Sequence, residues 1–484
     1  MARRTQFRLL VVITLGWLTW AGWTLLEDPQ PFTLRVVDDV GDPVVNAVVA
    51  AQSRQLGITG TEGLLDVDPS GELIEISAPG HVSATFTITP PDDGLFDVVL
   101  KARVLRGKVV DSDGRPIEGA TVVAGPARAR SDEQGRFAAR GAEPGPVVVG
   151  RPAWEPVEFE WSGGPGEKEI VMEPIMVKAV HISGEAVEER FETFVEMAAS
   201  TELNALMVDL KEESGQVLYE SEVPEVAEYS ADAGLYDLAA VAEVAEQNDL
   251  YLIGRLVTFQ DPIAARANPE MAVWDEETQA PFTSRDQYFL DPTDPVARAY
   301  ALDIAAEACA LGLDEVQFDY VRFPDARPES VRFDAGVTID IRAEAIRSFL
   351  GEARSLLHPL GCAVAVDVFG FVTTATDDGG IGQRWEDITS AADVVSPMVY
   401  PSHYDPGWYG LESPNEHPHV VVDRALADGM ARMSSRVVVR PWLQDFGYSA
   451  AQVRAQVEVA EKHGLGWMLW NATSEVTVGA LEAD

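Results

Sequence analysis

Three aspartates in this sequence lie at or near the ends of short apolar segments that are typical of β-strands: Asp209, Asp319 and Asp367. Near Asp319, Val316 and Phe318 alternate with polar residues, so a period of two puts the apolar pair and the aspartate on opposite faces of the strand. A carboxylate is costly to bury unless it has a partner or a use. Such carboxylates can act as acid, base or nucleophile, although an aspartate at a strand end can also be purely structural.

Polar and aromatic side chains gather on the same segments and on those that follow them. Such a mixture suits a poly- or oligosaccharide, because aromatic rings pack on the C–H faces of a pyranose while polar groups bind its hydroxyls. Some of these aromatic residues can equally belong to a hydrophobic core. The predicted substrate-binding residues are Asp209, Lys211, Arg255, Gln317, Arg322, Tyr400, His403, Tyr404, Arg440, Trp442, Gln444, Asp445, Trp470 and Asn471.

Eight apolar segments alternate with segments rich in Ala, Glu and Arg, which predicts βα units around a parallel sheet. Eight units in this span predict an α/β fold of the (β/α)8 TIM barrel type. A doubly wound sheet is less favoured, because no glycine-rich phosphate loop follows the first strand. The predicted strands are 177–183, 205–210, 250–258, 315–321, 362–369, 393–400, 437–443 and 466–471, and the predicted helices include 237–247, 295–311, 341–357, 420–432 and 450–463.

In a barrel, alternate residues of each strand face the helices and the interior. This places Val208 toward the helices and Asp209 inside, and likewise Val366 toward the helices and Asp367 inside. Active sites of such barrels lie at the carboxyl ends of the strands. The three aspartates are therefore predicted to converge on one site.

Composition narrows the range of partners. The formal net charge is −43, with 79 acidic and 36 basic residues, so the surface repels nucleic acid and a nucleic-acid role is disfavoured. Cys309 and Cys362 fall in predicted core elements, and we expect two isolated buried thiols rather than a disulfide. No metal-ligand spacing is present, and we expect no metal and no cofactor.

The pattern of residues 1–28 predicts that the protein is exported. Arg3, Arg4 and Arg8 precede an uncharged segment, 9–26, that approaches the length needed to span a bilayer. Tryptophans cluster toward its outer end, as in an interfacial belt. We expect an uncleaved, single-pass signal-anchor with the later domains extracytoplasmic, and the alternative is secretion after cleavage.

The next 145 or so residues contain an internal repeat, because 37–49 returns as 110–122 and 59–63 as 131–135. Short strands rich in Val, Ile and Thr, separated by Gly, Pro and Asp, predict two β-sandwich domains, 29–102 and 103–175. The motif V-x-D-x-x-G-x-P-[VI]-x-x-A resembles the carboxypeptidase regulatory-like family. That resemblance implies a transthyretin- or immunoglobulin-like spacer or adhesion module without a catalytic site.

The remaining domain, 176–484, resembles a glycoside-hydrolase-like family of (β/α)8 barrels, the DUF4015 type. The motifs that carry the resemblance span the barrel in order, at 203–211, 315–324, 367–370, 378–383, 396–404, 440–446 and 466–471. One departure is that the chain ends soon after the eighth strand, so the last helix is expected to be short. The resemblance implies a glycosidase and leaves the sugar undefined.

Glycoside hydrolysis needs two carboxyl groups that flank the scissile bond. Similarity to glycosidases with an aspartate on the fourth strand implies that Asp319 is the nucleophile or base. Asp367 would then be the acid, with a pKa raised by burial. Asp209 and Asp445 are further candidates for either role. Arg255, Arg322 and Arg440 could hold Asp319 ionised. The stereochemical outcome stays open.

Two other functions are compatible with these residues. A non-catalytic carbohydrate-binding or cell-wall-associated protein could use the same aromatic cleft, with its acids accepting hydrogen bonds from hydroxyls. A metal-dependent enzyme such as a deacetylase is less favoured, because His181, His403, His417 and His419 lack ligand spacing.

Overall fold

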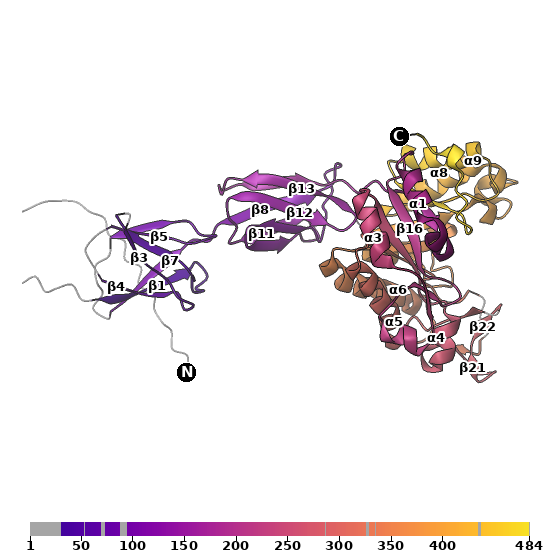
Figure 1. The fold of residues 1–484 in the computed structure, drawn as a ribbon, viewed down its shortest axis with the longest axis horizontal. Helices are drawn as coiled ribbons and strands as arrows, with labels where there is room; N and C mark the ends of the chain where they lie inside the picture. The colour runs from indigo at the N-terminus through magenta and orange to yellow at the C-terminus, as the bar shows by residue number, and fades with distance from the viewer. Residues whose placement is uncertain are drawn as a thin grey trace, which may run out of the picture. The chain divides into compact units, whose positions relative to one another are not determined.

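The structure, a computed structural model, describes residues 31–483 except 53, 69–72, 88–93, 286, 326–328, 334 and 434–436. The chain divides into two compact units. One holds the described residues up to Val104 together with 125–127 and 140–145, and the other holds 105–124, 128–139 and the chain from Pro146 onward (Figure 1). The predicted signal-anchor at 1–28 lies outside the described residues. Within the described ranges, no helix has the length and apolar character to cross a membrane.

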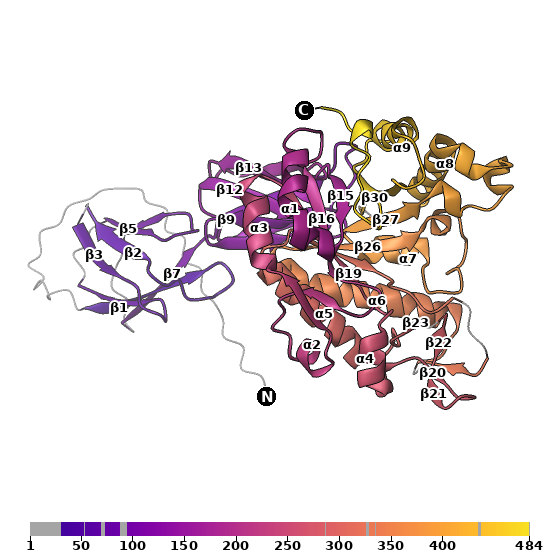
Figure 2. The ribbon, with the colours of Figure 1, turned by 45° about the vertical axis from the view of Figure 1, so that its right-hand side comes forward.

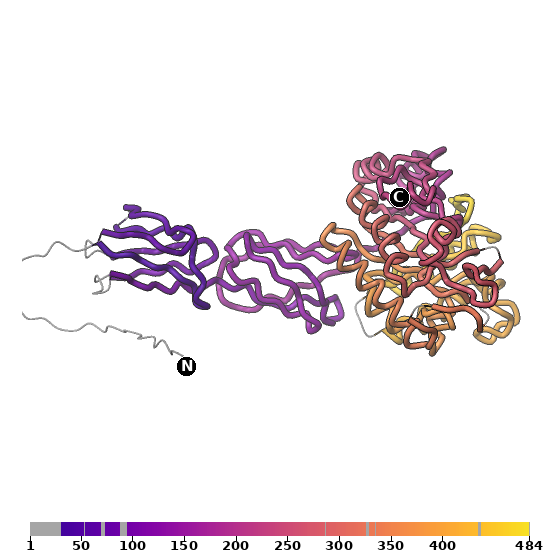
Figure 3. The backbone as a smooth tube through the Cα atoms, turned by 90° about the horizontal axis from the view of Figure 1, so that it is seen from below, coloured from indigo at the N-terminus to yellow at the C-terminus, as the bar shows by residue number. Residues whose placement is uncertain are grey.

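The two N-terminal β-domains repeat one another strand for strand. Sheets ordered β4-β1-β7 and β3-β2-β5-β6 return as β11-β8-β14 and β10-β9-β12-β13, which confirms the internal repeat (Figure 3). The predicted family of these domains and their predicted boundaries stay predictions. The strands are β1 (Phe32–Asp38), β2 (Val48–Ala51), β3 (Arg54–Ile58), β4 (Leu64–Val67), β5 (Leu73–Ser77), β6 (Ala84–Thr87), β7 (Leu95–Leu100), β8 (Val104–Val110), β9 (Thr121–Ala124), β10 (Ala127–Arg130), β11 (Arg136–Arg140), β12 (Gly145–Arg151), β13 (Trp154–Trp161) and β14 (Glu167–Val171).

Eight parallel strands then close into a barrel, because β15 pairs with both β16 and β30 (Figure 2). The prediction of a TIM-like barrel is confirmed. The seventh strand is interrupted at Pro441, whose nitrogen has no hydrogen to donate. In sheet order the strands are β15 (Lys178–Ile182), β30 (Trp467–Trp470), β29 (Trp442–Gln444) with its short preceding segment β28 (Val438–Val439), β27 (Val394–Val399), β26 (Ala363–Phe369), β24 (Glu315–Asp319), β19 (Tyr251–Val257) and β16 (Ala205–Lys211).

Helices surround this ring of strands, and side-chain caps fix several of their starts. Asp237, Asp294 and Ser449 each lie at the N-cap of a helix and accept hydrogen bonds from its first turn. The covering helices are α1 (Gly184–Ala198), α3 (Leu238–Gln247), α5 (Pro295–Ala310), α6 (Ile339–Leu357), α7 (Trp385–Ala391), α8 (Pro418–Ala431) and α9 (Ala450–Lys462) (Figure 2).

Excursions from the barrel follow several strands. Those after β16 and β19 are the longest. The excursions contain β17 (Val217–Tyr219), α2 (Pro224–Glu228), β18 (Asp232–Tyr236), α4 (Pro262–Ala267), η1 (Pro269–Met271), β20 (Trp274–Asp275), β21 (Ala280–Pro281), β22 (Thr283–Ser284), β23 (Gln287–Tyr288), β25 (Val331–Arg332), η2 (His358–Leu360), η3 (Gly370–Thr373), η4 (Pro401–His403), η5 (Trp408–Gly410), η6 (Pro414–Glu416) and η7 (Val478–Ala480).

The faces of the strands follow the predicted alternation. Val316 and Phe318 belong to the large core between strands and helices, and the ring of Phe318 lies 5.3 Å from that of Phe349 on α6. A second, smaller core inside the barrel contains Met207 of β16 and Met468 of β30. The polar residues of opposite parity therefore project into the barrel.

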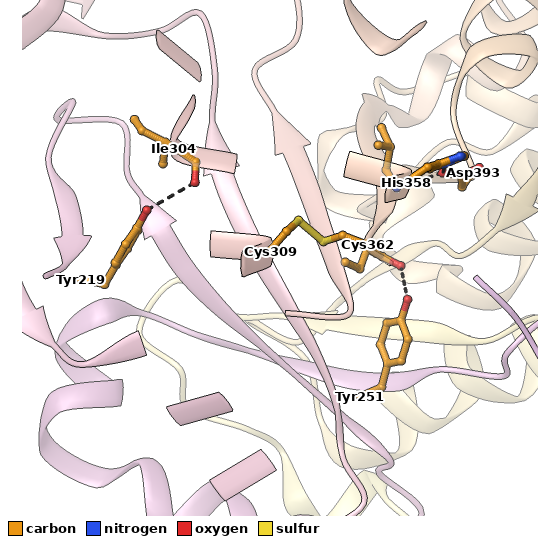
Figure 4. Close-up of a disulfide and its surroundings, with 9 residues drawn as sticks. Tyr219, Tyr251, Ile304, Cys309, His358, Cys362 and Asp393 are labelled. Atoms are coloured by element: carbon orange, nitrogen blue, oxygen red, sulfur yellow. Dashed lines mark hydrogen bonds and ion pairs between the residues drawn. A yellow bond between two sulfur atoms is a disulfide. The ribbon is translucent and has the colours of Figure 1, made fainter. Parts of the chain in front are cut away.

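The expectation of two free thiols is wrong. Cys309 in α5 and Cys362, just before β26, form a disulfide with their Cα atoms 5.9 Å apart (Figure 4). The end of α5 leads into β24, and β26 is the neighbouring strand, so both cysteines lie at the amino-terminal end of the barrel. The two cysteines are 53 residues apart in the sequence, so no local motif indicates that they pair.

Candidate active site

A cavity of about 510 Å³ lies at the carboxyl ends of the strands. Nine of the residues predicted to act on or bind a substrate line it. They are Arg255, Asp319, Arg322, Asp367, Tyr400, His403, Tyr404, Trp442 and Trp470.

Arg255 of β19 holds Asp319, the last residue of β24. Its Nε and Nη2 donate to Oδ2 of Asp319 at 2.9 and 2.6 Å. The other oxygen of Asp319 accepts a hydrogen bond from the backbone N–H of Tyr320 at 2.7 Å. Charge-assisted hydrogen bonds of this kind favour the ionised carboxylate.

The same guanidinium binds two further carboxylates. Nη1 of Arg255 donates to Asp209 at 3.0 Å, and Nη2 also donates to Glu213 at 2.6 Å. Behind it, His181 bridges Asp209 Oδ2, at 2.9 Å, and the carbonyl of Asn471, at 3.0 Å. Burial favours a raised pKa for Asp209, but His181 and Arg255 outweigh it and lower that pKa to about 2.

Asp367 of β26 has different surroundings. Its Oδ1 accepts hydrogen bonds from the indole N–H of Trp442, at 2.7 Å, and from the amide of Gln317. Its Oδ2 accepts none from the described residues, and the residue lines the cavity. Burial, followed by the negative charge of Asp319, raises the pKa of Asp367 well above its usual range. A carboxyl group with a raised pKa therefore faces the space beside one that is ion-paired with a guanidinium.

The cavity wall is mainly aromatic and neutral. The rings of Trp442 and Trp470 lie 5.3 Å apart at a near-right angle. Burial and the charge of Asp367 raise the pKa of Tyr400, and burial lowers that of His403. Tyr400 and His403 thus offer uncharged hydrogen-bonding groups at neutral pH.

Tyr320, next to Asp319, has a φ of 51°. This left-handed conformation is unusual for a bulky residue and is found where the surrounding structure enforces it. It lets the Tyr320 N–H reach the carboxylate of Asp319 while the ring lines the cavity. The turn after β24 is therefore shaped by the site.

The other predicted substrate-binding residues lie outside the lining. Lys211 is buried against Asp261, at 2.9 Å, and Arg440 pairs with Glu315, at 2.5 Å. Asp209 and Gln317 lie behind Arg255 and Asp367 and act on the cavity only through them. Gln444, Asp445 and Asn471 hold loops of the barrel rim, through bonds to Ser402, Thr477 and Glu475 among others.

Several lining residues were not among the predicted site residues. Most of them lie on loops or beyond a strand end, where no periodic signal exists, whereas Phe369 and Met398 continue the inward parity of β26 and β27. They are Glu213, Tyr320, Phe369, Gly370, Phe371, Gln383, Met398, Asp405 and Trp408.

In the part of the chain that the structure describes, no group of three or more His, Cys, Asp or Glu side chains is placed to hold a metal ion. Asp209, Glu213 and Asp319 are instead ion-paired with Arg255, and Asp209 also with His181.

Comparison with known proteins places the barrel in a family. The model of DUF4015, described as "Putative glycosyl hydrolase domain", matches residues 179–476. A search of curated proteins gave no match.

Several solved structures are similar to parts of the chain. A hypothetical protein from Ruminiclostridium thermocellum ATCC 27405 is 34% identical, over 38% of this chain and 96% of that one, with a TM-score of 0.35. The glycoside hydrolase domain of PgaB (BpsB) from Bordetella bronchiseptica is 11% identical, over 62% and 95%, with a TM-score of 0.46. The α-galactosidase TtGalA from Thermus thermophilus is 15% identical, over 74% and 78%, with a TM-score of 0.40.

The family match begins in β15 and ends beyond β30, so it spans every strand of the barrel and more than half of the chain. This chain therefore belongs to the DUF4015 family.

Proposed function

We propose that the barrel hydrolyses a glycosidic bond in a poly- or oligosaccharide, with Asp319 as nucleophile and Asp367 as acid. Membership of the family supports a glycosidase-like function. The observation that carries the residue assignment is the contrast between the two carboxyl groups in one cavity. Asp319 is ion-paired with Arg255, whereas Asp367 meets only neutral donors and has a raised pKa.

We propose a retaining mechanism, because the two carboxyl groups arise from equivalent positions on neighbouring strands. Asp319 and Asp367 each lie one position beyond the paired residues Phe318 and Val366, on neighbouring strands about 4.8 Å apart. Retaining glycosidases place their carboxyl groups about 5–5.5 Å apart, and inverting ones roughly 6.5–9.5 Å.

In the first step, Asp367 donates its proton to the glycosidic oxygen while Asp319 attacks the anomeric carbon and the bond to the leaving sugar breaks. In the second step, the ionised Asp367 takes a proton from water, and the water oxygen displaces Asp319. The aromatic side chains that line the cavity would contact the sugar.

A carbohydrate-binding protein without catalysis is the second candidate. The observation that favours it is the sharing of Arg255 among Asp209, Glu213 and Asp319, because a carboxylate in a strong ion pair is a weaker nucleophile.

A polysaccharide screen that measures reducing-sugar release and binding in parallel distinguishes a hydrolase from a carbohydrate-binding protein without catalysis. We expect wild type to cleave at least one glycan and Asp319→Asn and Asp367→Asn to lose at least about a hundredfold in rate while still binding it. Asp340→Asn, an exposed carboxylate on α6, is the matched control. Full activity in both site variants would refute the assignment, and binding without cleavage by wild type would favour the second candidate.

We further propose that the protein is exported and stays anchored in the cell membrane through residues 1–28, with secretion after cleavage as the alternative. The disulfide Cys309–Cys362 supports an oxidising compartment. In this arrangement the β-domains at 29–102 and 103–175 act as spacers for the barrel at 176–484. Fractionation and protease accessibility of cells that express the chain with and without residues 1–28 test the proposal.

A further inference from the structure

The cavity contains a second buried guanidinium, which the proposed mechanism does not use. Arg322 follows β24, three residues after Asp319, and only 8% of its surface is exposed. It lines the same cavity as Asp319 and Asp367. A ligand bound beside the two acids would therefore reach it.

Aromatic rings surround this guanidinium. Its Cζ atom lies 5.6 Å from the ring centroid of Phe289 and 5.3 Å from those of Tyr320 and Phe369. Its Nη1 donates to the carbonyl of Phe323 at 3.3 Å. Cation–π contacts fix the plane of a guanidinium and leave its charge without a counter-ion.

Arg322 differs in this respect from Arg255. Arg255 is ion-paired with three carboxylates, at 2.6 to 3.0 Å. Among the described residues, no carboxylate lies within ion-pair distance of Arg322, and burial lowers its pKa despite the more distant charges of Asp325 and Asp319. A buried cation normally has an anionic partner.

The remaining donors of Arg322 point to where such a partner would come from. Its Nε and Nη2 donate to no described residue, and they are not among the side-chain atoms that are sealed from solvent without a partner. They are therefore open to the cavity, where a ligand can accept their hydrogen bonds.

We propose that Arg322 binds the carboxylate of an acidic sugar, so that the substrate of this barrel carries a carboxylate next to the bond that is cleaved. This inference rests on the proposed function. A guanidinium fork matches a carboxylate with two parallel hydrogen bonds, and Tyr320 and Phe369 line the same cavity beside it.

The charge of the whole protein narrows the substrate further. A net charge of −43 opposes the approach of a polyanion at low ionic strength. This repulsion is screened beyond about 8 Å at physiological salt, so one carboxylate that is inserted beside Arg322 escapes most of it. The substrate we infer has single acidic sugars flanked by neutral ones rather than a continuous run of acidic sugars.

The test compares two forms of one probe. The probe is a mixed oligosaccharide with one uronic acid between neutral hexoses, and its partner is the same oligosaccharide after reduction of the carboxyl group to the alcohol. Binding is measured by calorimetry, with Asp367→Asn in every protein to prevent turnover. Arg322→Gln removes the charge, Arg322→Lys keeps it without the fork, and Arg347→Gln on the surface of α6 is the matched control.

We expect the acidic form to bind roughly 10- to 100-fold more tightly than the reduced form, because hydrogen bonds to a charged group are the strong ones. Arg322→Gln should abolish this preference, because the loss of affinity is expected to be far larger for the acidic form than for the reduced form. Arg322→Lys should keep part of the preference, and Arg347→Gln all of it. Should Arg322→Gln fail to fold, the reduced but persistent preference of Arg322→Lys carries the same conclusion.

Equal binding of the two forms, or a loss in Arg322→Gln that is the same for both, would overturn the inference and leave a structural or hydroxyl-binding role for Arg322. Tighter binding of a polyuronate than of the mixed oligosaccharide would overturn the restriction to single acidic sugars. If wild type cleaves neutral glycans and reduction of the carboxyl group has no effect on binding, the inference about Arg322 is wrong and the proposed hydrolase function stands. If the protein prefers the acidic form but wild type cleaves no glycan, the proposed hydrolase function is wrong and the carboxylate site at Arg322 stands.

Discussion

Asp319 and Asp367 occupy equivalent places on adjacent strands, yet one accepts hydrogen bonds from a charged donor and the other only from neutral donors. The donors to Asp319 are a guanidinium and a backbone amide, and those to Asp367 are an indole and a side-chain amide. Because a charged donor compensates a buried carboxylate far better than a neutral one, two identical side chains can take different chemical roles.

Asp367→Asn tests the role of the acid. We expect the rate to fall about 10²- to 10⁴-fold on a glycoside with a poor leaving group, and much less on an aryl glycoside whose phenolate needs no proton. In wild type, activity should fall as the pH rises through the raised pKa of Asp367, and this limb should be absent from the residual rate of the variant. Equal losses on both substrates would contradict the assignment.

The same substitution should stabilise the protein. Burial raises the pKa of Asp367 in the folded state, so its contribution to stability is fully present below the pKa of the unfolded chain, about 4, and is lost as the pH rises through the folded value. At pH 7, Asp367→Asn should therefore gain at least about 1 kcal/mol. Thermal melts from pH 4 to pH 8 should show a gain that grows with pH, whereas a gain independent of pH would contradict this cause.

At the scale of elements, the period of two was enough to predict the barrel and which face of β24 and β26 carries each aspartate. Strand periodicity does not predict what an inward-facing side chain binds. Lys211 pairs with Asp261, and this ion pair depends on the turn that leads into α4. Glu213 and Asp405 belong to loops, where no periodicity tells which side chain reaches the cavity. The disulfide depends on which elements become neighbours at the amino-terminal end of the barrel.

The disulfide ties α5 to the start of the strand that carries Asp367. The disulfide joins two cysteines that are 53 residues apart and so restricts the conformations of the unfolded chain. The double variant Cys309→Ala/Cys362→Ala should therefore lose about 4 kcal/mol of stability. Activity at 25 °C should change little, because both cysteines are remote from the cavity lining. Denaturant titrations should show that reductant destabilises wild type alone. A variant as stable as wild type would contradict the expectation.

Gly370, just after β26, allows Tyr404 to close over the cavity. A Cβ at this position would lie 2.6 Å from the carbonyl oxygen of Met398 and would also collide with the hydroxyl of Tyr404. We expect Gly370→Ala to lower kcat/KM at least about tenfold through displacement of this wall. Gly351→Ala in α6, where a Cβ meets nothing within 4 Å, is the control and should gain about 0.5–1 kcal/mol. Equal activity of the two variants would exclude a role for this close approach.

For the whole molecule, the excess of 79 acidic over 36 basic residues must repel itself in the folded state. Stability should therefore rise with ionic strength. We expect the melting temperature to increase by several degrees between about 0.05 M and 0.5 M NaCl, as the screening length falls. Sucrose at equal osmolarity serves as the control, and an equal rise in sucrose would assign the effect to solvent exclusion instead of charge.

The chain contains two kinds of sheet: the barrel, which is closed through β15, and the open sheets of the two β-domains. Every strand of the barrel ring has a neighbour on both sides, whereas the β-domains leave β3, β4, β6 and β7 with a neighbour on one side only among the described residues, and likewise their counterparts in the second copy. Open edges can accept a strand from another chain, and a closed ring cannot. Fibrous self-association of this protein would accordingly start in its β-domains and leave the cavity at the carboxyl ends of the barrel strands accessible.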